Sequence, residues 1–127
     1  MKRLFGSLLA LTIAAGCSDS VGPDDYYAVW GGEGVRLTLS ETQARFETSC
    51  WAGELAIPIQ VDGSRFTAIG TISSQGGAGM TETRAVILYG TLDDDELRLR
   101  VETSFQMGPY TLHRDVPVDI PGCPVTP

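Results

Sequence analysis

Over most of this chain, apolar residues recur at every second position. In residues 35–40 the odd-numbered positions are aliphatic and the even-numbered ones are polar, and residues 96–101 repeat the alternation with leucines and a valine. Successive side chains of a β-strand point to opposite faces, so this period predicts strands with one buried and one solvent-facing side. After the first 16 residues, no segment carries the 3.6-residue period of an amphipathic helix. The pattern therefore predicts an all-β fold.

Turn residues divide the alternating pattern into seven or eight short strands. The expected strands are residues 26–30, 35–40, 44–50, 55–61, 65–72, 83–92, 96–101 and 110–114. Glycine, proline and acidic residues lie between them, and most connections are short enough for hairpins. Successive hairpins favour a single small antiparallel β-barrel, with a β-sandwich as the second choice.

Several positions within these strands are irregular. Pro58 lacks a backbone donor, so it belongs at an edge or a bulge. Gly70 predicts a bend or bulge of the kind that closes a curved sheet. Residues 83–92 are apolar on both faces, which predicts the most enclosed strand of the fold. The glycine-rich residues 73–79 predict a loop, which is a candidate lid over a barrel mouth.

The first 16 residues have the features of a targeting segment. Lys2 and Arg3 precede an apolar run over residues 4–15, which is shorter than the roughly 20 residues that a membrane-spanning helix needs. The run therefore predicts a secretory signal helix that is removed on maturation. Ala14 and Gly16 would also satisfy ordinary signal cleavage, so secretion without a lipid is the alternative.

The sequence Ala14-Ala15-Gly16-Cys17 resembles the lipobox of bacterial lipoproteins. The resemblance implies cleavage between Gly16 and Cys17, a lipid on the Cys17 thiol and a fatty acyl chain such as palmitate on the new amino group. This covalent lipid is the membrane anchor, and no other cofactor is expected. The resemblance places the protein in the bacterial cell envelope.

Ser18 follows the predicted lipidation site. Because it is not the acidic residue that retains many lipoproteins at the inner membrane, the outer membrane is the favoured location, on its periplasmic or surface face. The expected organisation is a signal peptide over residues 1–16, a lipidated N-terminus and flexible tether over residues 17–25, and an antiparallel β domain over residues 26–127.

The charge of the chain excludes one large class of partners. The full sequence has a net charge of −7, and the mature chain would keep seven arginines against sixteen acidic residues, a net charge of −9. Such a surface is repelled by phosphate backbones, so nucleic-acid binding is not expected.

If Cys17 carries a lipid, Cys50 and Cys123 remain as a pair in an oxidising compartment. We expect a disulfide between them, because they are far apart in sequence and lack the C-x-x-C spacing of metal or redox sites. Two unpaired buried thiols, or a metal or redox pair, are the alternatives. The disulfide would tie the C-terminal tail to the body of the domain.

No residue pattern indicates catalysis. His113, the one histidine, lies at a solvent-facing position of the last expected strand. The chain has no Gly-x-Ser-x-Gly elbow, and no lysine would remain after processing to act as a base. Residues 93–96 are acidic but lack the alternate spacing of a calcium loop, so they predict a hairpin turn. We therefore expect neither an enzyme nor a metal site.

Trp30 lies in the first expected strand, and Arg114 lies in the last. Together with the strand pattern, these positions resemble lipocalin-like and other calycin barrels, and the small β-barrel lipoproteins that include periplasmic lysozyme inhibitors. In calycins a tryptophan closes one end of the barrel beneath a basic residue of the last strand. The resemblance makes Trp30 and Arg114 a candidate barrel-closing pair, joined by a cation–π contact.

The expected function is that of a binding or interaction module, which holds a small apolar ligand or docks on an envelope protein. A structural envelope protein without a ligand is one alternative, and an inhibitor of an envelope-targeting enzyme such as a lysozyme is another. A barrel interior filled with side chains would count against the small-ligand form. Trp51 is expected to pack beside the disulfide, with an exposed contact as the alternative, and Tyr26 and Tyr27 are candidates for a contact surface.

Overall fold

The computed structural model of the chain describes residues 22–74 and 81–123. The predicted signal peptide, the lipidation site Cys17 and most of the predicted tether lie outside these residues, as does most of the predicted loop 73–79. In the two described ranges, no helix is long and apolar enough to cross a membrane.

Nine β-strands and one short 3-10 helix make up the regular structure of the described residues. The helix is η1 (Pro23–Tyr26). The strands are β1 (Ala28–Gly32), β2 (Val35–Leu39), β3 (Ala44–Glu47), β4 (Trp51–Glu54), β5 (Gln60–Asp62), β6 (Arg65–Ser74), β7 (Thr83–Asp93), β8 (Glu96–Glu102) and β9 (Tyr110–Arg114). The acidic residues after β7 form a tight hairpin turn into β8, as predicted.

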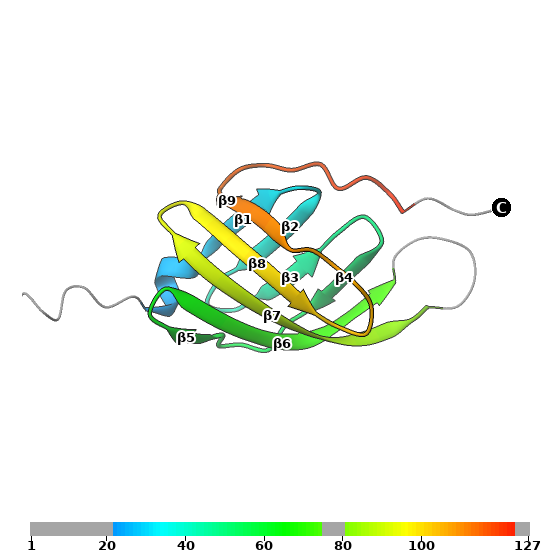
Figure 1. Cartoon of the computed structure of the whole chain (residues 1–127), viewed down its shortest axis with the longest axis horizontal. Coiled ribbons are helices and arrows are strands. Elements are labelled where there is room, and N and C mark those ends of the chain that lie inside the picture. Colours follow the sequence, from blue (N-terminus) through cyan, green and yellow to red (C-terminus); the bar gives the residue numbers. More distant parts are fainter. Residues whose placement is uncertain (1–21, 75–80, 124–127) are drawn as a thin grey trace, which may run out of the picture.

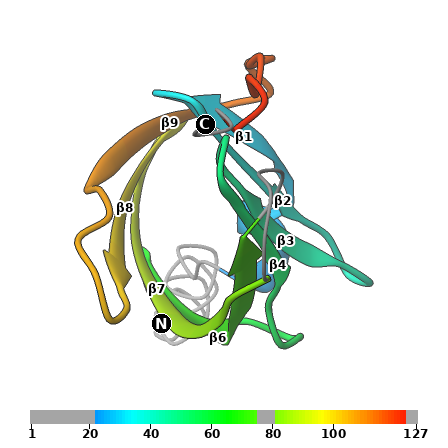
Figure 2. The same ribbon diagram turned by 90° about the vertical axis from the view of Figure 1, so that its right-hand side faces the viewer.

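The nine strands form one antiparallel sheet that closes on itself. Its order is β4-β3-β2-β1-β9-β8-β7-β6, and β4 also pairs with β6, so these eight strands form a barrel. β5 pairs with β6 as an additional strand. Figure 2 looks along the barrel, with β7, β8 and β9 curving round one side and β1 to β4 on the other. The predicted antiparallel barrel is confirmed, and the sandwich is wrong.

The inward-facing side chains fill the barrel with apolar atoms. Trp30, Phe46 and Phe66 are at most 2% exposed, and aliphatic side chains from the other strands join them in one packed cluster. Apart from aromatic residues, no polar or charged side chain is buried within the described ranges. An eight-stranded barrel is just wide enough for side chains to fill, so these residues occupy the interior themselves.

Two glycines allow the barrel to close between β4 and β6. A Cβ on Gly53 would lie 2.7 Å from the Cα of Ile72, and one on Gly70 would lie 2.8 Å from the Cα of Leu55. Real Cβ atoms do not approach other atoms so closely, so only glycine lets the two backbones meet here. Leu55 forms an isolated bridge with Gly70. Gly70 therefore lies where the curved sheet closes, as predicted.

The helix η1 lies at one end of the barrel (Figure 1), and Trp30 is hydrogen-bonded to it. The indole Nε1 donates a 2.9 Å hydrogen bond to the carbonyl oxygen of Tyr26, and both side chains are fully buried. The guanidinium of Arg114 lies 4.5 Å from the centre of the Trp30 ring and donates to the carbonyl oxygen of Asp25. The predicted contact between Trp30 and Arg114 is confirmed.

The flexible tether predicted over residues 17–25 is wrong at its C-terminal end, because η1 already folds there. The amide of Gly22 donates a 2.7 Å hydrogen bond to the carboxylate of Asp25. Tyr26 then packs edge-on against Phe66, with ring centres 5.2 Å apart, and this contact holds the helix on the barrel. Tyr26 is therefore a core residue and not part of a contact surface.

The strand predicted over residues 55–61 is also wrong, because the chain leaves the sheet around Pro58. β4 ends at Glu54, and β5 begins only at Gln60. Pro58 has no N–H to give to a ladder, which disfavours a strand paired on both sides, and residues 56–59 lie outside any strand. Ile57 lies in the break and is 43% exposed.

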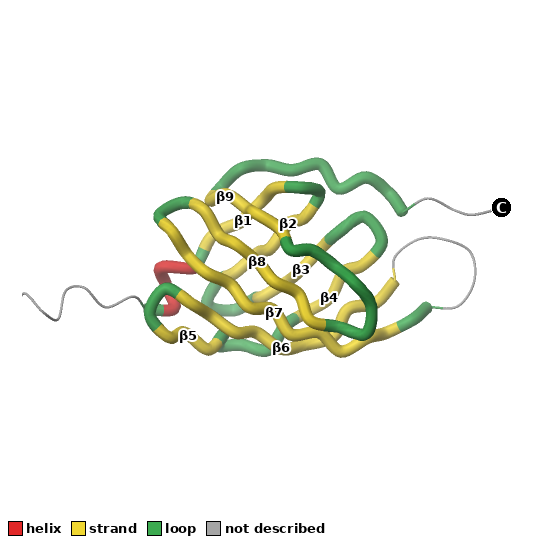
Figure 3. Tube along the Cα trace, viewed as in Figure 1, coloured by secondary structure: helices red, strands yellow, loops and turns green. Residues whose placement is uncertain are grey.

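After β9 the chain continues as a strap, residues 115–123, which contains no helix or strand (Figure 3). The amide of Asp115 donates a 2.8 Å hydrogen bond to the carbonyl oxygen of Val29 in β1. At the end of the strap, Cys123 forms a disulfide with Cys50, which lies between β3 and β4. The predicted disulfide is confirmed, and it ties the strap to the barrel.

Candidate functional site

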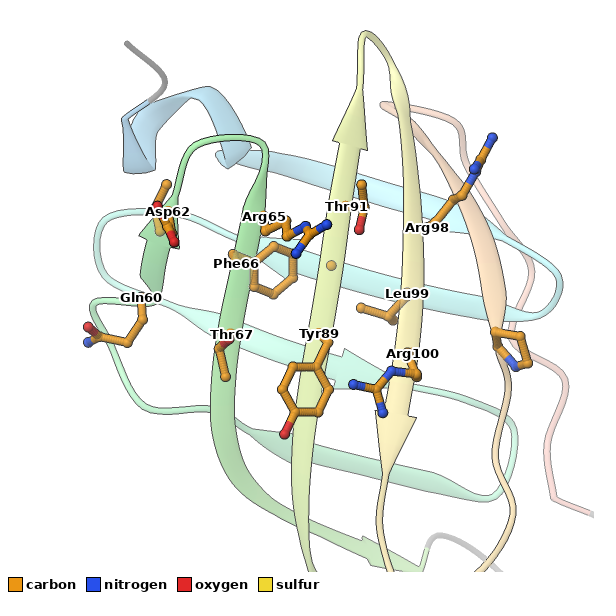
Figure 4. Close-up of a pocket in the computed structure, with 13 residues that line it drawn as sticks. Gln60, Asp62, Arg65, Phe66, Thr67, Tyr89, Thr91, Arg98, Leu99 and Arg100 are labelled. Carbon is orange, nitrogen blue, oxygen red and sulfur yellow. The ribbon is translucent and has the colours of Figure 1, made fainter.

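A groove of about 710 Å³ crosses the outer face of β5 to β8 (Figure 4). Its lining combines three arginines with a tyrosine, hydroxyl and amide side chains. The lining residues are Gln60, Val61, Asp62, Arg65, Phe66, Thr67, Tyr89, Gly90, Thr91, Arg98, Leu99, Arg100 and Pro109. This volume is typical of sites that hold small ligands, and we term it the arginine groove.

Strand register brings these side chains together from three strands. Arg65 of β6 pairs with Thr91 of β7, which pairs in turn with Arg98 of β8. Two residues further along, Tyr89 pairs with Arg100. Neighbouring strands lie about 4.8 Å apart, and paired residues point to the same side of a sheet. The charged and aromatic side chains therefore share one small area of the outer face.

Phe66 and Gly90 support this area from inside the barrel. They pair across β6 and β7, and a Cβ on Gly90 would lie 2.6 Å from an atom of the Phe66 ring. The absence of a side chain at this position lets the ring pack directly beneath β7. Because Phe66 is itself only 2% exposed, the groove lies over a packed part of the core.

Arg100 lies over the ring of Tyr89. Its guanidinium carbon is 4.2 Å from the ring centre, which is a cation–π contact. Glu102 lies nearby: it accepts a 3.4 Å hydrogen bond from the Tyr89 hydroxyl, and its closest approach to the Arg100 guanidinium is 3.8 Å. This ion pair is long, and both side chains are more than half exposed, so it competes weakly with an anionic ligand for Arg100.

Arg65 and Arg98 flank β7 and differ in their partners. The Nε of Arg98 donates a 3.1 Å hydrogen bond to Glu96, and the side chain points away from β7 in Figure 4. Arg65 has no ion pair in the part of the chain that the structure describes, whereas the six other arginines there each have one. Figure 4 shows Arg65 and Arg100 reaching toward β7 from opposite sides. We term these two residues the arginine clamp.

The lining residues of the arginine groove carry more positive than negative charge, although the protein as a whole is negative. Its lining holds three arginines and one acidic residue, Asp62, whereas the whole chain has a net charge of −7. Opposite charge attracts an anionic group to the groove, while the acidic surface around it repels large polyanions. The groove is therefore suited to a ligand that carries few negative charges.

A second groove, of about 330 Å³, is lined by residues of the β1–β2, β3–β4 and β8–β9 connections. These connections lie at the end of the barrel opposite η1 (Figure 1). Its aromatic lining includes Trp51, Phe105 and Tyr110, and the rings of Trp51 and Phe105 are 4.9 Å apart. Burial is the main cause that raises the pKa of Tyr110. Trp51 is half-buried and packs against Phe105, with part of its surface on this second groove.

The residues singled out from the sequence lie outside the arginine groove. Arg114 lies over the ring of Trp30, and Cys50 is bonded to Cys123. His113 is exposed on β9, as its position in the alternation predicted.

The groove residues were missed because residues 83–92 were expected to form an enclosed strand. β7 instead buries Val86 and Leu88 on one face and leaves the face with Tyr89 only partly covered. The alternation in β8 did place Arg98 and Arg100 on the outer face. The alternation does not give the strand register, which places these arginines opposite particular residues of β7.

No known protein family, curated protein or solved structure matches this chain. In the two described ranges, no three His, Cys, Asp or Glu side chains gather closely enough to hold a metal ion. The kind of ligand that the groove could bind is therefore inferred from the side chains that line it.

Proposed function

We propose that this protein is a lipid-anchored binding module of the bacterial cell envelope, and that it takes its ligand or partner in the arginine groove, outside the barrel. The observation that carries the proposal is the arginine clamp. Arg65, without an ion pair in the described ranges, and Arg100, which lies over the Tyr89 ring two residues further along, reach toward β7 from opposite sides on a protein of net charge −7. Paired guanidinium groups in a concave site are well suited to bind an oxyanion.

Packing in the core supports binding outside the barrel over binding inside it. Trp30, Phe46 and Phe66 are large, inward-facing and at most 2% exposed. An apolar ligand would have to displace such side chains, each of which gains about 1.5–3 kcal/mol from burial. The small apolar ligand expected from the sequence is thus the less favoured form of the binding module.

The lipid anchor is supported by the Ala14-Ala15-Gly16-Cys17 motif. Cys17→Ala should abolish incorporation of radiolabelled palmitate and release the protein from the membrane fraction. Ser18→Ala is the matched control, because it changes the neighbouring residue and leaves the acceptor thiol in place. Palmitate labelling that persists in Cys17→Ala would overturn the anchor.

Binding in the groove can be tested by photo-crosslinking in intact cells. Thr67 lines the groove, and Thr38 lies on the outer face of β2, far from it in the sheet order. A benzoylphenylalanine at position 67 should give a discrete adduct under ultraviolet light, and the same residue at position 38 should not. Both threonines are half-buried on outer strand faces, so the two variants are closely matched.

Arg65→Gln in the background of the position-67 probe should weaken the adduct, because it removes half of the clamp. A probe at position 67 that gives no adduct, or one no stronger than that at position 38, would show that the groove is not the binding surface.

A further inference from the structure

We propose that the ligand of the arginine groove is an oligosaccharide that carries a single carboxylate, held between Arg65 and Arg100 above β7. This inference rests on the proposed function, because it names the ligand class of the same groove. The neighbouring hydroxyl and amide side chains then bind the neutral sugar hydroxyls.

The clamp favours a carboxylate. The cation–π contact holds the Arg100 guanidinium over the Tyr89 ring, and a guanidinium presents its N–H groups in one plane. A planar carboxylate can accept two parallel hydrogen bonds from such a group, and Arg65 approaches from the opposite side of β7.

Charge balance disfavours a phosphate dianion. Asp62 lines the groove, Glu102 lies 3.8 Å from Arg100, and the whole chain is acidic. Counted with Glu96, the ion-pair partner of Arg98, these carboxylates balance the three arginines of the groove. A second negative charge on the ligand therefore gains little net attraction in the groove, and the acidic chain around it repels that charge.

Backbone pairing favours a sugar over a peptide segment. Extended peptides usually bind at a sheet edge, where unpaired backbone N–H and C=O groups form a new ladder. Here β6 pairs with β5 and β7, and β7 pairs with β6 and β8, so the backbone groups of the two strands beneath the clamp are already used. β5 is an edge strand, but its free edge lies on the side away from β6, so a peptide added there would not lie over β7. Above β7, only side chains face the ligand.

The side chains around the clamp match sugar chemistry. Gln60, Thr67 and Tyr89 lie in register across β5, β6 and β7, and Thr91 lies beside Arg65. Hydroxyl and amide groups both donate and accept hydrogen bonds, as sugar hydroxyls do. Because the strands are about 4.8 Å apart, a chain of sugars lying across them would meet a polar side chain at each strand.

The test uses the full lipidated chain in non-ionic detergent and isothermal titration calorimetry. The probe is a glucose tetramer whose terminal sugar is glucuronic acid. Its matched control is the same tetramer with that carboxyl reduced to an alcohol, which is neutral and of nearly the same shape. We expect saturable binding of the acid, and binding at least about tenfold weaker for the alcohol, because a charge-assisted contact is lost.

Three arginine variants separate geometry from net charge. Arg65→Gln and Arg100→Gln should each weaken binding of the acid at least about tenfold, with little effect on binding of the alcohol. Arg98→Gln removes the same charge from the same groove, but its side chain is bound to Glu96 and points away from β7. It should weaken binding by less than about threefold. Thermal unfolding of each variant checks that the barrel is intact.

Several results would overturn the inference. Equal affinity for the acid and the alcohol would show that the carboxylate is not recognised, and equal losses from all three arginine variants would show that only net charge acts. Tighter binding of the 6-phosphate tetramer, or of a tetrapeptide with one glutamate, would assign another ligand class. If no probe binds while position 67 still crosslinks in cells, the ligand class is wrong and the binding module stands. If crosslinking fails as well, both proposals fall.

Discussion

Gly53→Ala tests directly how the barrel closes. A Cβ at this position would lie 2.7 Å from the Cα of Ile72, and ordinary van der Waals contact begins at 3.4 Å. The carbonyl oxygen of Thr71 lies closer still, so the backbones of β4 and β6 would have to separate by at least about 0.7 Å, the difference between these two distances. A backbone hydrogen bond of about 2.9 Å lengthened by that amount reaches about 3.6 Å, at which it is no longer a hydrogen bond.

The number of hydrogen bonds at risk sets the size of the effect. β4 and β6 share two ladder pairs, and the amide of Ala56 donates a 2.7 Å hydrogen bond to Ile69 just beyond them. Loss of two or three such bonds, at about 1 kcal/mol each, lowers the free energy of unfolding by about 2–3 kcal/mol. This is a large share of the roughly 5–15 kcal/mol that stabilises a small domain.

Urea denaturation followed by the fluorescence of Trp30 and Trp51 measures this change. Gly122→Ala is the control, because no atom lies within 4 Å of a Cβ built there. We expect a clear fall in the urea midpoint for Gly53→Ala and almost none for Gly122→Ala. Equal midpoints for the two variants would refute the claim that a close backbone approach at Gly53 closes the barrel.

Three further predictions concern the end of the barrel at η1 and the disulfide of the strap. Arg114→Gln should lower the free energy of unfolding by about 1–2 kcal/mol, because the guanidinium leaves the Trp30 ring, and an unchanged melting temperature would contradict this. Cys50 and Cys123 are 73 residues apart, so reduction of their disulfide should lower the free energy of unfolding by about 4 kcal/mol, because the unfolded chain gains conformational entropy. The urea midpoint with and without reductant measures this change. Burial raises the pKa of Tyr26 above its ordinary value of 10.0, so its contribution to stability is complete below pH 10.0 and is lost as pH rises through the raised pKa. Tyr26→Phe should therefore lose less stability than the wild type between about pH 9 and about pH 12, and parallel curves would count against this role.

The barrel could be predicted from the sequence because alternation is a local property. Leu37 and Leu39 are buried and Arg36 and Thr38 are not, as their order in the sequence indicates. The same reasoning placed Arg114 in the last strand, where it covers Trp30. These predictions depend only on which face of its strand each residue occupies.

The arginine groove could not be predicted in the same way. Arg65 and Arg100 belong to different hairpins, and they meet only because β6, β7 and β8 pair with a particular register. Alternation shows that both side chains face outward, but it does not show which outward-facing residues are neighbours. Pro58 was predicted at an edge or a bulge, but the break over residues 56–59 was not predicted, because an apolar residue such as Ile57 continues the alternation while its backbone leaves the sheet.

The bond between Cys50 and Cys123 makes a covalent ring of everything between them, from β4 through β9 and the strap. A protease that cuts once anywhere from residue 51 to residue 122 would open this ring and release no fragment. The severed pieces would stay joined through sulfur, and the new chain ends could find each other again without diffusing apart. A nicked molecule would keep its full mass on a non-reducing gel and separate into two bands only when the bond is reduced.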